Sequence, residues 1–117
     1  MEGLFFRFYI RSNQRHAGRR VWEWLLDQGM RLEIRGGSAF EAAGGFGRHH
    51  TLHEARPVEF TDASTVEVDF IATPEEGQRL LEVLRQEGLR LFYACVPATF
   101  GVINPDLADP SPISDGT

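Results

Sequence analysis

Residues 43–56 combine more chemically active side chains than any other stretch of the chain, with three glycines, three histidines and two arginines in one run. Glycines this close together allow positive φ angles and a close approach of the backbone to a ligand. Successive N–H groups in such a turn form a concavity that binds anions, and arginine guanidiniums add charge-assisted hydrogen bonds. The stretch therefore predicts a site for a phosphate or a carboxylate, with these ligand-binding residues: Gly45, Phe46, Gly47, Arg48, His49, His53 and Arg56.

The histidines of the same stretch support a second interpretation. His49 and His50 lie four and three residues before His53, so on a helical turn their imidazoles would share a face with it. Such a group could hold zinc or copper, and the alternative prediction is a divalent-metal site formed by His49, His50 and His53. A third interpretation is a polar surface loop whose glycines only turn the chain. Residue types alone leave all three open.

An enzymatic role has the least support. His49 or His53 could serve as a general base. The sequence, however, offers no nucleophile with an evident base, no paired carboxylates in a defined site and no nucleotide-fold fingerprint. We therefore expect a binding protein and not an enzyme.

Composition narrows the class of protein further. A chain of 117 residues is long enough for one domain with its own core, and a net charge of −5 argues against nucleic-acid binding. The single Cys95 cannot form an internal disulfide, and the N-terminus lacks the pattern of a signal peptide. No apolar run approaches the roughly 20 residues that a membrane helix needs. These observations predict a cytoplasmic protein without direct membrane insertion.

The elements that must position residues 43–56 follow from hydrophobic periodicity. Alternating residues predict strands at 4–11 and 65–72, a short strand at 38–43 and a fourth strand at 89–96. Helical spacing predicts one helix over about residues 21–32. A second begins after Thr73, where Pro74 and Glu76 complete an N-terminal capping signal, and ends at Gly88. Residues 44–64 then connect the second and third strands.

The resulting order, βαββαβ, predicts an α+β ferredoxin-like sandwich with a four-stranded antiparallel sheet and two helices on one face. Residues 1–103 form this domain, and residues 104–117, rich in Pro, Asp, Ser and Gly, are predicted to be a disordered C-terminal tail. On the uncovered face Phe5, Arg7 and Tyr9 would stand beside residues 67–71. Aromatic side chains mixed with opposite charges suit a subunit interface, so we expect an oligomer.

Several of these residues resemble a known family. The main motif of this resemblance is Gly45-Phe46-Gly47-Arg48-His49, with His53 and Arg56 after it. Two earlier segments also contribute to the resemblance, Gly37-Ser38-Ala39-Phe40 and Gly18-Arg19-Arg20-Val21-Trp22-Glu23. Together they resemble the small bacterial PII-like proteins catalogued as a domain of unknown function, DUF190, which are related to PII signalling proteins. The likeness spans about residues 4–96.

This resemblance implies a PII-like fold and a homotrimer with a signalling or regulatory role. A small anionic effector, such as an adenine nucleotide or a metabolite, would bind in clefts between subunits. The 44–60 loop would contact a partner, such as a transporter or a metabolic enzyme. Trimeric relatives that bind metal also exist, which keeps the histidines in consideration.

Overall fold

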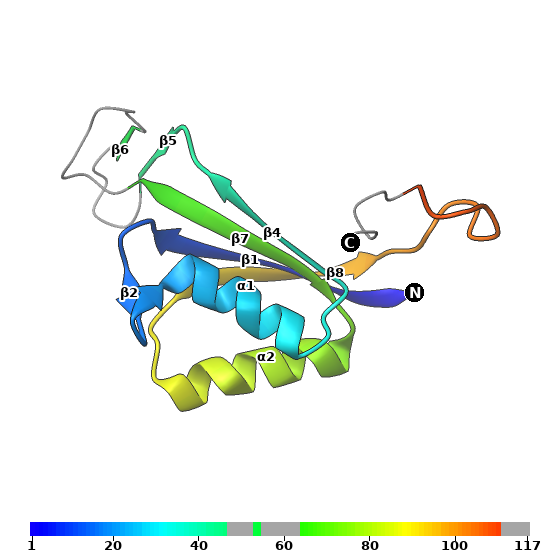
Figure 1. Ribbon diagram of the computed structural model, residues 1–117, viewed down its shortest axis with the longest axis horizontal. Coiled ribbons are helices and arrows are strands. Elements are labelled where there is room, and N and C mark those ends of the chain that lie inside the picture. Colours follow the sequence, from blue (N-terminus) through cyan, green and yellow to red (C-terminus); the bar gives the residue numbers. More distant parts are fainter. Residues whose placement is uncertain (47–52, 55–63, 111–117) are drawn as a thin grey trace.

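The computed structural model describes residues 1–46, 53–54 and 64–110, and for 53–54 it describes the backbone alone. Within these residues the chain forms one four-stranded antiparallel sheet with two helices on one face (Figure 1). This confirms the predicted α+β, ferredoxin-like architecture. The main elements are β1 (Glu2–Arg11), α1 (Val21–Arg31), β4 (Gly36–Glu41), β7 (Thr65–Ala72), α2 (Pro74–Glu87) and β8 (Phe92–Thr99).

The strand order is β4-β7-β1-β8, so β1 and β7 lie at the centre and β4 and β8 at the edges. The register of β1 against β7 pairs Phe5 with Ile71, Arg7 with Asp69 and Tyr9 with Glu67. Directly paired residues project to the same side of a sheet, and successive residues project to opposite sides. These three pairs therefore lie together on the face without helices, as the sequence predicts.

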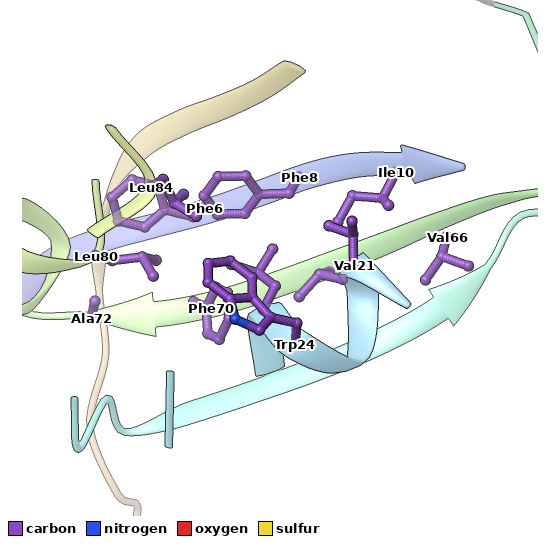
Figure 2. Close-up of a cluster of buried hydrophobic side chains, with 12 residues drawn as sticks. Phe6, Phe8, Ile10, Val21, Trp24, Val66, Phe70, Ala72, Leu80 and Leu84 are labelled. Atoms are coloured by element: carbon purple, nitrogen blue, oxygen red, sulfur yellow. The ribbon is translucent and has the colours of Figure 1, made fainter. Parts of the chain in front are cut away.

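The opposite face of the same strands carries the core. Phe6, Phe8 and Phe70 are buried there between the sheet and the helices, with Leu80 from α2 (Figure 2). Leu25 from α1 is buried in the same cluster. The rings of Phe8 and Phe70 pack edge to face with their centroids 6.1 Å apart, an arrangement that aromatic rings favour. Twelve buried apolar side chains form this cluster. None of the described polar side chains is buried, so apolar packing alone holds the helices on the sheet.

Helix α2 begins and ends where local chemistry requires. The Thr73 hydroxyl accepts a hydrogen bond from the Glu76 N–H, and the Glu76 carboxylate accepts one from the Thr73 N–H. Gly88 ends the helix in the left-handed region at φ 70°. Both capping predictions are confirmed, because a capping box and a C-terminal glycine depend only on nearby residues.

Two strand positions differ from the prediction. The last strand is β8 at Phe92–Thr99 and not 89–96, because Leu89 and Leu91 pack against the core within the connection from α2. Pro97 lies inside β8, which an edge strand tolerates because one side of it needs no ladder bond. Strand β4 begins at Gly36 and not at 38. Its Gly37 faces the Phe70 ring, where a Cβ would come within 2.8 Å of Cε1.

The predicted boundary near residue 103 stays a prediction. Residues 100–110 continue from β8 as an exposed segment with a turn in which the Leu107 N–H donates to the Asn104 carbonyl at 3.1 Å. The rest of the predicted tail, residues 111–117, lies outside the described residues. Within the described part of the chain, neither helix has the length and apolar character needed to cross a membrane.

Candidate functional site

The glycine- and histidine-rich stretch begins in a short two-stranded ladder. Strand β5 (Gly44–Gly45) pairs antiparallel with β6 (His53–Glu54), and Gly45 lies opposite His53. Figure 1 shows this ladder near the end of β4 and the start of β7. Two predicted ligand residues, eight positions apart in sequence, are therefore neighbours in the backbone. Phe46 follows directly and is largely exposed.

The other predicted residues of this stretch cannot be placed in the same way. Gly47, Arg48, His49, His50 and Arg56 lie outside the described residues. Their assignment to an anion site, or of the histidines to a metal, stays a prediction.

Hydrogen bonds tie the base of the loop to the end of β1. The Ala42 N–H donates to the Thr65 carbonyl at 2.8 Å, which holds the two arms of the loop together. The Ser12 N–H donates to the Ser64 carbonyl at 2.8 Å, and the Ser64 N–H donates to Ser12 Oγ at 3.2 Å. The Ser64 hydroxyl also contacts the Glu41 carboxylate. The loop therefore leaves the sheet from a base held by three segments of the chain.

A second hairpin, which the hydrophobic periodicity does not indicate, stands at the same end of the sheet (Figure 1). Strands β2 (Arg15–His16) and β3 (Arg19–Arg20) pair across Ala17 and Gly18, which both adopt positive φ, 54° and 77°. Two successive positive φ angles define the tight turn that matches strand twist. In the sequence, Gly18 is the residue that could have indicated this turn, but an alanine before it makes the indication weak.

This hairpin gathers arginines beside the base of the loop. Arg20 Nη1 donates to the Ser12 carbonyl at 2.7 Å, and Arg15 Nη2 donates to the Gly18 carbonyl at 2.9 Å. Arg19 Nη1 lies 3.4 Å from an Asp27 carboxylate oxygen. A guanidinium carries five N–H donors, so a single bond to a carbonyl orients it while using a small part of its capacity to bind an anion.

A shallow hollow of about 430 Å³ lies between the hairpin, the start of α1 and the end of β4. Its polar lining residues are Arg20, Ser12, Glu23 and Glu41, and Trp22 and Phe40 also line it. Its volume falls in the range of small-molecule sites. Arg20 is the cationic side chain of this lining and could meet an anionic group, although two carboxylates stand beside it.

Comparison with known proteins assigns the chain to a protein family. The DUF190 family model, described as "Uncharacterized ACR, COG1993", matches residues 3–89. The chain belongs to the DUF190 family. No curated protein sequence matched it.

Solved structures share the DUF190 chain's fold at low identity. CPII from Thiomonas intermedia K12, a nitrogen regulatory PII-like protein bound to ADP, AMP and bicarbonate, matches with a TM-score of 0.64 at 14% identity, over 87% of this chain and 91% of that one. The ADP- and bicarbonate-bound CPII structure has a TM-score of 0.61, with the same identity and coverage. A PII-like signalling protein from Thermus thermophilus matches with a TM-score of 0.58 at 16% identity, over 84% and 88%.

In this DUF190 chain the β2–β3 hairpin is also joined to the far end of α2. His16 Nε2 lies 2.7 Å from a Glu87 carboxylate oxygen. The imidazole also packs edge to face on the Trp24 ring, with the ring centroids 4.9 Å apart. Three segments distant in sequence therefore meet at this end of the sheet. Among the described residues, which do not include His49 or His50, no group of three or more potential metal ligands occurs.

The open face of the sheet has a charged centre in an apolar surround. Arg7 forms two hydrogen bonds to Asp69, at 2.9 and 3.0 Å, and lies 3.5 Å from Glu67. These hydrogen bonds are the main reason why the pKa of the Arg7 guanidinium is raised above its usual value. Around the ion pair stand exposed or half-buried apolar side chains: Phe5, Tyr9, Phe40, Ile71, Phe92 and Val96.

Proposed function

We propose that this DUF190 protein is a PII-like signalling protein that binds a small anionic effector at the loop end of its sheet. The observation that carries the proposal is that the Gly45–His53 ladder, the β2–β3 hairpin with its arginines and the hollow beside Arg20 all lie at that end of the sheet (Figure 1). The fold is shared with CPII, whose structures hold ADP, AMP and bicarbonate. An adenine nucleotide is therefore the effector class to test first. The described site holds donors that bind an anion, and we assign it no catalytic step.

The ligand contacts are proposed from the chemistry of the loop. Backbone N–H groups at Gly45 and Gly47 and the guanidiniums of Arg48 and Arg56 would hold the phosphates. Phe46, His49 and His53 would complete the site. Binding would order the 44–60 loop and so change which partner, a transporter or a metabolic enzyme, the loop can contact.

The open sheet face supports a homotrimer with the effector clefts between subunits. Its apolar side chains gain stability when another surface removes them from water. The Arg7–Asp69 pair already satisfies its charges within one chain, so it can enter an interface without an unpaired charge.

Calorimetric titration of two variants tests the proposal against the metal alternative. Arg48→Ala removes a charge-assisted contact to the anion, so ADP binding should weaken by about 1.5–3 kcal/mol, one to two decades in affinity. The paired variant His49→Ala/His53→Ala should lower ADP affinity less, and Zn²⁺ should bind weakly to every form.

Two results would contradict the proposal. One is the absence of binding by ADP, AMP and bicarbonate to the unmodified chain. The other is tight Zn²⁺ binding that disappears only in the histidine variant, which would favour a metal site formed by His49, His50 and His53.

A further inference from the structure

The chain beyond β8 leaves the sheet in a fixed direction. We call residues 100–110 the C-terminal arm. At its start the Phe100 N–H donates to the Met1 carbonyl at 2.9 Å, and the Met1 ammonium donates to the Phe100 carbonyl at 2.8 Å. The Phe100 ring occupies the space above Gly3, and the Arg35 guanidinium lies 5.4 Å from the ring centre. These contacts aim the arm away from the end of the sheet, as Figure 1 shows.

Beyond this anchor the arm presents apolar side chains to water. Val102, Ile103 and Leu107 are 76%, 89% and 70% exposed. The arm also has a defined turn, with Asn104 at φ 57° and a hydrogen bond from the Leu107 N–H to the Asn104 carbonyl. Three large apolar groups on one short shaped segment are typical of a segment that docks on another surface.

A matching apolar groove lies between α2 and β8. It has a volume of about 180 Å³ and is lined by Leu81, Leu84, Leu89, Leu91 and Tyr93. Arg85 stands in its lining, and Arg90 belongs to the connection that carries Leu89 and Leu91. The arm carries Asp106 directly before Leu107, and Asp109 follows. Arg85 also lies 3.3 Å from the Glu82 carboxylate, an exposed ion pair of small worth that an aspartate of the arm could replace. The two surfaces are therefore matched in apolar residues and, at Arg85 and Arg90, in charge.

The two surfaces lie at opposite ends of β8. Tyr93 and Thr99 are six residues apart on this strand, which corresponds to about 20 Å. To reach its own groove the arm would have to reverse and return along the whole strand, against the direction set by Phe100. We propose that the C-terminal arm docks in the α2–β8 groove of a second copy of this chain. This inference rests on the oligomer proposed above and adds the segment that joins neighbouring subunits.

Disulfide cross-linking of the full chain tests the contact. In a Cys95→Ala background, which removes the exposed native thiol, Leu107→Cys in one chain is co-expressed with Leu89→Cys in another. Mild oxidation should link the two different chains. The matched control replaces Leu89→Cys with Gln78→Cys, an exposed position of α2 that does not line the groove. Its yield should be several-fold lower.

Charge reversal gives a second readout. Asp106→Arg in the arm chain should lower the yield up to about fivefold, the range for an exposed ion pair. Arg85→Asp in the groove chain should restore it.

Each contrary outcome has a separate meaning. A disulfide within one chain of the double variant Leu107→Cys/Leu89→Cys, with none between chains, would place the arm in its own groove and overturn the inference. No disulfide in either arrangement, with light scattering still giving an oligomer, would overturn the arm contact and leave the oligomer standing. A monomeric mass would overturn both. ADP titration of the same variants reports on effector binding independently.

Discussion

The two faces of the sheet are made by alternate residues of the same strands, yet they are completed in different ways. On the covered face Phe6, Phe8 and Phe70 are buried by the chain's own helices. On the open face Tyr9, Ile71 and Phe92 stay exposed around the Arg7–Asp69 pair. One face is therefore buried when the chain folds, whereas the other has the composition of a surface that is buried when subunits associate.

This difference separates two kinds of stability. Substitutions on the covered face should change the free energy of unfolding of each chain. Substitutions on the open face should change the dissociation constant of the oligomer. The following variants test this separation, beginning with the largest expected effect.

Phe8→Ala should lower the free energy of unfolding by about 3–5 kcal/mol. Phe8 is fully buried and packs against both Phe70 and Tyr93, so its removal leaves a cavity that close-packed neighbours fill only in part. Urea unfolding at fixed protein concentration measures the change. A loss below about 1 kcal/mol would mean that the helices do not pack on this face as described.

Phe92→Ser should weaken the oligomer by about 1.5–3 kcal/mol, one to two decades in its dissociation constant, because a large side chain then stays out of the interface. Sedimentation equilibrium measures this constant. Met30→Ser on α1 is the matched control, since Met30 is 75% exposed and Phe92 73%. Equal effects of the two variants would contradict an interface on the open face.

Gly37→Ala and the neighbouring Gly36→Ala compare the faces at adjacent positions of β4. A Cβ on Gly37 would come within 2.8 Å of Cε1 of the Phe70 ring, and the same ring atom also lies close to Gly29. The overpacking should cost about 1–3 kcal/mol, partly offset by the roughly 0.5–1 kcal/mol gained on replacing a strand glycine. Gly36 has open space around its Cβ position, so its substitution should be neutral or stabilising. Thermal unfolding of both variants decides between these outcomes.

Local patterns predicted the central sheet and the second helix well. Strand β7 runs from Thr65 to Ala72 as predicted, because its strict alternation follows from one buried and one open face. The error at β8 arose because Leu89 and Leu91 alternate like a strand while they pack in a connection. At β4 the strand was expected to begin at residue 38, whereas it begins at Gly36, and the small size of Gly37 makes room for the Phe70 ring.

The candidate site was harder to predict than the fold. The spacing of Gly45 and His53 gave no sign that they pair in a ladder, because such pairing depends on contacts across the loop. The β2–β3 hairpin was equally difficult to predict, because Ala17-Gly18 is a weak turn signal. Its approach to the loop is set by hydrogen bonds between Ser12 and Ser64, which are 52 residues apart. The sequence showed which residue types could bind an anion, but only the fold shows which of them lie close together.

Amide hydrogen exchange of the full chain with and without ADP tests the central claim most directly. If the effector binds at the loop end of the sheet, ADP should slow exchange in residues 44–56 and in the hairpin at residues 12–20. The C-terminal arm at residues 100–110, at the opposite end of the sheet, should serve as an internal control and show little change. Unchanged exchange in residues 44–56 at saturating ADP would contradict the account.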